Sequence, residues 1–341
     1  MRQRILLSLV LLACAAPGFT RDKTDVIQLL NGDRITGEIK KLEYGKLRFS
    51  TDAMGTLNIE WDEIAFIDSD YAFEFELTSG DRYFGTLEAA ETPQRVGIGI
   101  SGQMAEFANE RVIRIDPIED QFWDRLTGSL SLGYNYTKAS DVTQFSFSSS
   151  ATYRVQDVAT TLDISSIVTV DSTERRTNRE NISLQRQRFR GKRWFTSVIG
   201  SVERNDELGL NARTSIGIGG GRYLVQSNIS EFALYGGIQA NREVLTGDVD
   251  SQSNVEGLAG VSYKRYIYDD PSVDISTSLE TYPSLSDRGR IRAELNARIR
   301  YEVIDDLFLD LTLYDSYDSD PPSGVDSTND YGIVTSLGWS F

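Results

Sequence analysis

The stretch Tyr331-Gly-Ile-Val-Thr-Ser-Leu-Gly-Trp-Ser-Phe341 decides the fold. Successive side chains of a β-strand point to opposite faces, and here one face carries large apolar residues while the other carries small ones. Only Thr335 interrupts the large face, and only Val334 is bulky and apolar on the small face. The strand that closes a transmembrane β-barrel needs this division between lipid and lumen, with aromatic residues at the water interface. The large face, ending on an aromatic last residue, consists of Tyr331, Ile333, Leu337, Trp339 and Phe341.

The same alternation extends upstream to about residue 125 and is clearest over residues 290–302. A helix cannot produce this pattern, because its period is 3.6 residues rather than 2. One face of this segment carries Ile291, Ala293, Leu295, Ala297, Ile299 and Tyr301. The other face carries the charged residues that we expect to line a lumen, namely Arg290, Arg292, Glu294, Arg298, Arg300 and Glu302.

The pattern predicts an all-β protein whose residues 125–341 form an antiparallel transmembrane barrel of about 12 strands. The strands are expected to start near residues 126, 142, 158, 179, 193, 210, 229, 253, 273, 289, 305 and 330. The fourth strand is irregular, because Ile182 and Leu184 share a face with Arg186 and Arg188, which predicts a bulge or a position at the bilayer edge. Short connectors near residues 156, 190, 226, 268 and 304 predict periplasmic turns, and longer polar ones at 171–178, 243–252 and 317–329 predict external loops.

A repeat precedes the barrel, within a predicted domain over residues 24–120. Residues 32–39 align with residues 80–87, and both segments begin Gly-Asp-Arg, a turn sequence between strands. The two repeats, about 26–70 and 74–118, predict a small duplicated SH3-like or Sm-like β domain. This domain is expected to lie in the periplasm. There it would bind a periplasmic protein or the cell wall, or serve as a plug, stalk or folding aid.

The first 20 residues have the features of a secretory signal peptide. Arg2 and Arg4 precede a short apolar run over residues 5–13, and small residues follow it. A run of nine residues is too short to cross a bilayer as a helix. Ala13-Cys14-Ala15 offers an ordinary cleavage site, but Leu11-Leu12-Ala13-Cys14 also resembles a lipobox, so Cys14 is a candidate lipidation site as well as a residue to be removed.

The composition excludes several kinds of chemistry. The chain has no histidine and one cysteine, which removes histidine-dependent triads, including that of an outer-membrane esterase, and cysteine-rich zinc sites. A formal charge of −16 disfavours nucleic acid as a partner. An acid-rich segment lacks the spacing of a calcium loop, so we interpret it as a solvated loop containing Asp315, Asp318, Asp320, Asp326 and Asp330. We therefore expect no enzyme, no cofactor and no metal.

Three stretches together resemble a known family. They are Leu-Asn-Gly-Asp-Arg-Ile-Thr-Gly-Glu at 30–38, Ile-Glu-Trp-Asp-Glu-Ile at 59–64, and Gly-Trp-Ser-Phe at 338–341. With this order of domains, the chain resembles the salt-induced outer-membrane protein family, a domain-of-unknown-function β-barrel family of Gram-negative bacteria. The resemblance covers nearly all of the chain after the signal peptide. It implies an outer-membrane location and no established activity, and it supplies no catalytic residues.

Three functions remain open from the sequence. The first is a non-enzymatic outer-membrane barrel with a structural or envelope role, whose partners are membrane lipid, the barrel assembly machinery through the last strand, and a periplasmic protein or the cell wall. The second is a small-solute or ion channel with a charged lumen, although we favour a narrow or plugged one. The third is a secreted soluble β-protein that binds glycans.

Overall fold

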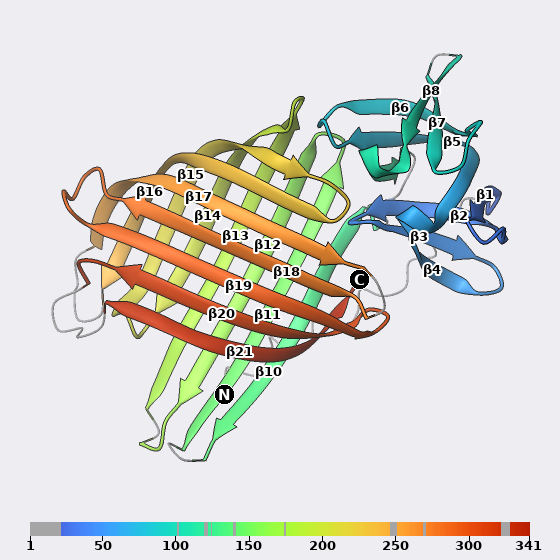
Figure 1. Ribbon diagram of the computed structural model, residues 1–341. Coiled ribbons are helices and arrows are strands. Elements are labelled where there is room, and N and C mark those ends of the chain that lie inside the picture. Colours follow the sequence, from blue (N-terminus) through green and yellow to red (C-terminus); the bar gives the residue numbers. More distant parts are fainter. Residues whose placement is uncertain are drawn as a thin grey trace.

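The computed structural model describes residues 22–100, 102–118, 122–123, 125–138, 141–173, 175–245, 251–268, 271–321 and 328–341. The predicted signal peptide and Cys14 lie outside the described residues. Two β structures follow one another along the chain, a small sheet domain and a closed twelve-stranded barrel (Figure 1). The expected all-β class and strand number are confirmed. In the described part of the chain, no helix has the length and apolar character needed to cross a membrane.

The small domain is a single sheet that bends back on itself. Its strands run in the order β4-β3-β2-β1-β5-β6-β7-β8, and β9 pairs with both β2 and β5. Two single-turn 3-10 helices, η1 (Trp61–Glu63) and η2 (Asn109–Arg111), interrupt it. The strands are β1 (Asp25–Leu29), β2 (Arg34–Glu43), β3 (Lys46–Thr51), β4 (Gly55–Glu60), β5 (Ile64–Leu77), β6 (Arg82–Ala89), β7 (Arg95–Ile100), β8 (Gln103–Ala108) and β9 (Val112–Pro117).

Residues 48 positions apart make the same backbone hydrogen bonds in the two halves of this domain. The Leu29 amide donates to Asp33, and the Leu77 amide donates to Asp81. The pairing of Ile27 with Ile67 in the first half corresponds to that of Phe75 with Ile115 in the second. Long strand β5 belongs to both halves, because its first part pairs with β1 and its second part with β6 and β9. The halves are therefore fused through one strand rather than linked as two separate barrels.

One apolar core serves both halves. Trp61 is 2% exposed, and its indole nitrogen donates to the carbonyl of Asn109 at 2.7 Å, while the Asn109 amide donates to the carbonyl of Ile64. These bonds tie η1 to η2 across the domain. Burial of apolar area is the main stabilising term. The core comprises Ile27, Ile39, Leu42, Leu47, Phe49, Trp61, Ile64, Ile67, Phe73, Phe75, Leu77, Leu87, Val96, Ile98, Val112 and Ile115.

The barrel strands begin within three residues of the expected positions, and each pairs antiparallel with the next. They are β10 (Leu126–Thr137), β11 (Val142–Val155), β12 (Val158–Val170), β13 (Arg176–Arg190), β14 (Trp194–Asn205), β15 (Leu210–Gln226), β16 (Ser230–Leu245), β17 (Ser251–Ile267), β18 (Val273–Pro283), β19 (Ile291–Ile304), β20 (Leu307–Asp318) and β21 (Asn329–Ser340).

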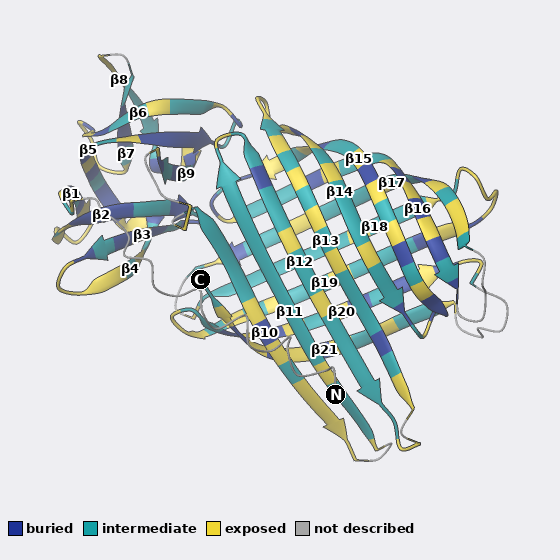
Figure 2. Ribbon diagram, turned by 180° about the vertical axis from the view of Figure 1, so that it is seen from behind, coloured by how far each residue is buried: buried dark blue, intermediate teal, exposed yellow. Residues whose placement is uncertain are grey.

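The last strand closes the barrel against the first. Strand β21 pairs with β10, with Leu337 opposite Leu132, and the backbones of Gly128 and Phe341 exchange two hydrogen bonds of 2.9 Å each. Closure leaves no strand edge unpaired in the ring, which is what a sheet in hydrocarbon requires. Trp339 and Phe341 are each about half exposed, as are Leu309 and Leu337, on the outer surface. Exposed and less exposed residues alternate along the strands (Figure 2), so the large side chains point out of the barrel rather than into a shared core.

Of the two alternatives for the fourth barrel strand, a bulge or a position at the bilayer edge, the structure excludes the bulge. Strand β13 pairs with β12 and β14 in unbroken register, and Arg186 and Arg188 lie towards one end of the barrel on its outer face. The second local expectation needs correction. The acidic segment is a solvated loop only in part, because Asp320 lies in an exposed bend whereas Asp315 and Asp318 belong to β20 and Asp330 to β21. Arginines far away in sequence neutralise Asp318 and Asp330, and the local pattern cannot reveal such partners. Asp326 lies outside the described residues.

Candidate functional site

The small domain is docked on the end of the barrel where the strand connections are short (Figure 1). Two of these connections and one strand end contact it directly. The Arg193 guanidinium donates to the carbonyl of Thr78, and the Asn228 amide donates to the carbonyl of Val112 at 3.0 Å. Lys46 of β3 forms an ion pair of 3.2 Å with Glu302, near the end of β19. The first barrel strand begins at this end and the last one finishes there, so the docked end is the one that carries both barrel termini.

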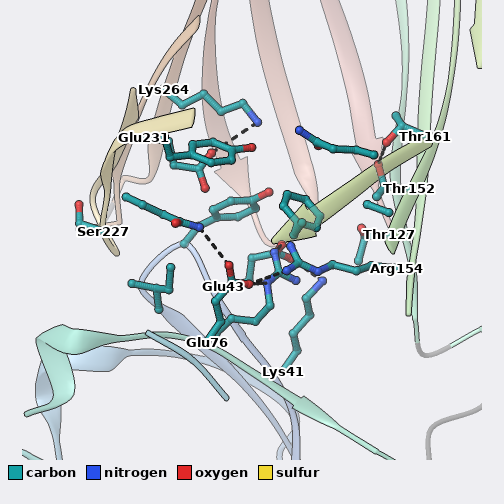
Figure 3. A pocket seen from close by; sticks show the side chains of 18 residues that line it. Lys41, Glu43, Glu76, Thr127, Thr152, Arg154, Thr161, Ser227, Glu231 and Lys264 are labelled. Atoms are coloured by element: carbon teal, nitrogen blue, oxygen red, sulfur yellow. Dashed lines mark hydrogen bonds and ion pairs between the residues drawn. The ribbon is translucent and has the colours of Figure 1, made fainter. Parts of the chain in front are cut away.

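At the centre of this contact, Glu76 of the small domain meets Arg154 of the barrel. Arg154 is near the end of β11 on its lumen face, and its guanidinium donates to the Glu76 carboxylate. Gln226 at the end of β15 donates to the other carboxylate oxygen at 3.2 Å. The Arg154 guanidinium also stacks 4.3 Å from the ring centroid of Phe189. Figure 3 shows Glu76, Glu43 and Lys41 directed from the small domain towards Arg154.

The sequence of β5 explains why Glu76 is presented to the barrel. Phe73, Phe75 and Leu77 alternate with Glu74 and Glu76, so the apolar side chains fill the core and the carboxylates emerge on the opposite face. Glu76 is nevertheless only 4% exposed, because the barrel mouth covers it. A carboxylate buried in this way must be paired with a cation or shift its pKa upward.

The electrostatics of the mouth keep its carboxylates charged. Burial acts to raise the pKa of Glu76, but nearby guanidinium groups, led by Arg154, outweigh it and lower the pKa. Burial likewise opposes ionisation of Glu43, and its ion pairs with Arg114 and Lys41 hold its pKa well below the ordinary value. The contact between the two parts is therefore ionic and desolvated. Removing one charge would leave its partner buried and unpaired.

Aromatic contact completes the docked surface. Tyr44, in the turn between β2 and β3, stacks on Tyr266 of β17 with ring centroids 4.3 Å apart. Gly45 has a φ of +77°, and a Cβ atom there would lie 2.5 Å from the ring of Tyr268. This turn therefore needs a glycine both for its backbone conformation and for close approach to the barrel.

Three cavities lie between the described parts of the small domain and the barrel, and the smallest, of about 90 Å³, is beside Glu74 and Arg154. Of the two larger cavities, the first, of about 170 Å³, lies around Glu43, Glu76 and Arg154 and reaches Lys264 (Figure 3). The second, of about 260 Å³, lies beside it between Lys46 and Asp274. Charged and hydroxyl groups dominate the wall of the first cavity, which suits water and small polar solutes, whereas the second cavity also has aromatic walls from Tyr44, Tyr266, Tyr268 and Phe308.

Ion pairs fill the lumen at the opposite end of the barrel. Arg290 makes a bidentate contact with Asp318, at 2.6 and 3.0 Å, and reaches Glu243 at 3.0 Å. Arg292 makes a bidentate contact with Glu256, at 2.7 and 2.9 Å. Glu243 and Glu256 are fully buried, so these pairs form a desolvated network. Arg213 adds to it by pairing with Glu203 and Glu243.

The other expected lumen charges lie on the same inner face of β19 but play different parts. Arg300 pairs with Asp310 at 3.0 Å and stacks on Phe308, while Glu302 binds the small domain through Lys46. Glu294 lies 4.0 Å from Arg292. Among the described residues, Arg298 has no carboxylate within ion-pair distance. The six charges therefore span the lumen from the paired network at one end to the docked domain at the other.

Sequence reasoning missed the acidic partners of these arginines and the whole contact at the mouth. Glu243 and Glu256 sit on the lumen faces of β16 and β17, and a search for charges at inward positions would have found them. Arg154 stands out in the same way, as the one charged residue on an inner face of β11 that otherwise carries Val142 and then only Gln, Ser and Thr. Within the described residues, no group of three potential metal ligands is present.

Comparison with known proteins places this barrel in a family. The model of a family described as "Protein of unknown function, DUF481" matches residues 130–341. The chain belongs to this family. The match confirms the expected membership of an uncharacterised β-barrel family, and the DUF481 region coincides with the barrel from β10 onward. No curated protein matches the chain.

Solved structures similar to this DUF481 protein include three membrane barrels. They are the NanC porin (9% identity, 62% of this chain and 98% of that chain, TM-score 0.40), an outer membrane channel from Pseudomonas putida F1 (9%, 63% and 95%, TM-score 0.38), and the translocator domain of the autotransporter NalP from Neisseria meningitidis (10%, 63% and 86%, TM-score 0.36). At such values the likeness carries no argument about function, which must come from this barrel's own geometry.

Proposed function

We propose that this DUF481 protein is a non-enzymatic outer-membrane barrel that holds its small domain in the periplasm as a cap over the barrel mouth. The observation that carries the proposal is the desolvated contact of Glu76 with Arg154, supported by the contacts of two barrel connections and of Glu302 on β19 with the small domain. The paired arginines and carboxylates at the other end narrow the lumen there as well. A barrel obstructed at both ends suits a structural or anchoring role better than free diffusion.

The outer surface supports the membrane location. Leu309, Leu337 and Trp339 are exposed on the outside, where a soluble glycan-binding protein would have polar residues. The short connections lie at the end that carries the small domain, and short turns in such barrels face the periplasm. This orientation places the domain within reach of a periplasmic protein or the cell wall. The last barrel strand, β21, would be the segment that engages the barrel assembly machinery.

Planar-bilayer recording tests the closed state. We expect the folded full-length protein to show little or no conductance, and a variant in which Glu76 and Lys46 are both replaced by Ala to conduct more often, because both bind the small domain to the barrel. Steady conductance of the unchanged protein, equal to that of the double variant, would refute the cap. Cell fractionation complements this test, and recovery of the protein in the soluble periplasm would refute the location.

A channel is the second candidate, and the middle of the lumen favours it. Between the paired network and the cap, most inward positions carry serine or glycine, which leave more room than the charged ends do. A channel that opens when the small domain moves away needs a part of the lumen that is lined by small side chains. It predicts ion-selective conductance after cap release that changes when Arg298 is replaced by Glu. The small inward residues include Ser131, Ser148, Ser165, Ser183, Ser201, Gly217, Gly237, Ser262 and Ser278.

A further inference from the structure

A group of arginines lies on the outer face of the barrel, at the end next to the small domain. Arg186, Arg188 and Arg190 occupy successive outward positions of β13, following Ile182 and Leu184 on the same face. Trp194 pairs with Arg190 on one side and with Arg222 of β15 on the other. We name Arg186, Arg188, Arg190 and Arg222 the arginine rim. All four side chains are exposed.

The rim is short of anionic partners within the protein. Arg188 binds Asp157 in the adjacent turn at 2.7 Å, and Arg222 lies 5.7 Å from the ring centroid of Trp194. Among the residues that the structure describes, neither Arg186 nor Arg190 has a carboxylate within ion-pair distance. Only one of the four arginines is therefore neutralised by a described side chain.

The sign of the charge is uniform at this end of the barrel. In the halves of the strands next to the small domain, none of the described outward positions carries Asp or Glu, whereas Arg265 on β17 adds a further cation. The opposite end differs, because there the outward positions include Glu180 and Asp315 beside Arg176 and Arg242. In a chain with a formal charge of −16, the charged residues at the described outward strand positions of this end are thus all arginines.

That level coincides with a membrane interface. Trp194 is exposed on the outer face, and tryptophan in membrane proteins concentrates at the headgroup boundary. Arginine side chains are long enough to carry their guanidinium groups from the hydrocarbon edge into the headgroups. Guanidinium groups bind phosphate oxygens in pairs of parallel hydrogen bonds, so arginine suits a phosphate better than lysine does.

We propose that the arginine rim binds the phosphate groups of anionic phospholipids in the periplasmic leaflet. This proposal rests on the proposed membrane location and orientation, since only then does the rim face phospholipid headgroups. It assigns a lipid-binding surface to β13–β15, separate from the lumen and from the cap. Anionic lipid would hold this flank of the barrel at a defined depth, beside the turn at residues 191–193 that contacts the small domain.

Quenching of tryptophan by brominated lipid measures the proposed binding. The full chain has four tryptophans, and Trp61 is buried in the small domain, so a W123F/W339F variant reports lipid contact from Trp194 alone. A W123F/W194F variant reports from Trp339 on β21 as the internal reference. Each is reconstituted into phosphatidylcholine vesicles with increasing brominated phosphatidylglycerol, and separately with brominated phosphatidylcholine as the neutral quencher.

We expect phosphatidylglycerol to be enriched about fivefold or more around Trp194, and about equally represented around Trp339. Replacing Arg186, Arg190 and Arg222 by Gln should abolish the enrichment at Trp194. Replacing Arg242 by Gln, an outward arginine at the other end, should leave it unchanged. An R186K/R190K/R222K variant keeps the positive charge, so we expect a smaller but measurable enrichment around Trp194. This variant provides a test if the Gln variant does not fold.

The outcomes separate this inference from the proposed function. Equal quenching of Trp194 by both lipids would overturn the phosphate-binding site while leaving the membrane barrel intact. Enrichment that survives the Gln substitutions would overturn the role of the rim. If neither lipid quenches Trp194 or Trp339 in the reconstituted protein, the membrane location itself fails, and this inference fails with it.

Discussion

The guanidinium of Arg154, on barrel strand β11, donates a hydrogen bond to the carboxylate of Glu76, 78 residues earlier in the small domain. Both side chains are largely buried, and Gln226 from a third part of the chain binds the same carboxylate. A salt bridge at the surface contributes little, but breaking a buried one leaves a charge without solvent or partner. This pair therefore makes the position of the small domain on the barrel testable by single substitutions.

Replacing Glu76 by Gln should loosen the small domain from the barrel. The cost of leaving Arg154 buried without its anion is about 3–5 kcal/mol. Hydrogen–deuterium exchange should then accelerate in residues 226–230, which contact the domain through Asn228. Glu106→Gln is the matched control, because Glu106 pairs with Arg95 within the small domain. Identical exchange in both variants would contradict a docking role for Glu76.

The pH dependence of the small domain should follow the lowered pKa values of Glu43 and Glu76. Both bind more protons when unfolded, so their stabilisation is complete above the ordinary value of 4.5 and is lost as pH falls towards their lowered values. Glu74 works in the opposite sense, because burial raises its pKa. We expect urea unfolding followed by Trp61 fluorescence to show constant stability from pH 7 to about 5 and a decline below it. A stability that rises between pH 5 and pH 3 would contradict the assignment.

Because of the ion pairs in the lumen, two arginines on one face of β19 should contribute differently to the stability of the barrel. Arg292→Leu leaves the fully buried Glu256 without its bidentate partner and should destabilise the barrel by about 3–5 kcal/mol. Arg298→Leu removes a charge that has no ion pair among the described residues and should cost much less. The urea midpoint for loss of the folded band on unboiled gels compares the two. Equal midpoints would mean that the pair with Glu256 contributes nothing.

Strand β21, which closes the barrel, should not tolerate a side chain at Gly338. A Cβ atom there would lie 2.4 Å from the Phe308 ring and 2.6 Å from the carbonyl of Leu130. Gly338→Ala should therefore destabilise the barrel by about 1–3 kcal/mol through overpacking. Gly200→Ala is the control, since its Cβ atom would meet only the carbonyl of Ser215 at 3.9 Å. The same urea series measures both, and an unchanged midpoint for Gly338→Ala would show that β21 can move away from Phe308.

The barrel could be predicted because its evidence is local. Along β20, the apolar residues Leu309, Leu311 and Leu313 alternate with polar ones. Such alternation can be read from neighbouring positions in the sequence, so it predicted where the strands lie and how many there are. The end of each strand could also be predicted from the sequence, since turn residues separate the alternating runs. The face of every strand followed from the same period, which is why the charges of β19 could be assigned to one face from the sequence.

The partners of those charges could not be predicted from the same pattern. Asp318 looked like part of an acidic loop because its neighbours in sequence are acidic, yet its contact is Arg290, 28 residues earlier. Asp330 likewise binds Arg179, 151 residues away. Contact between Glu76 and Arg154 depends on how two domains dock, and nothing in either segment alone records it. The lumen network and the mouth therefore required the structure.

A gel of boiled and unboiled protein, after detergent extraction of outer membranes, tests whether the chain folds as a closed barrel in the outer membrane. We expect the protein in the outer-membrane fraction, and we expect the unboiled form to migrate differently from the boiled one, because a closed barrel resists detergent until heated. Recovery in the soluble periplasm with identical mobility in both lanes would contradict this expectation.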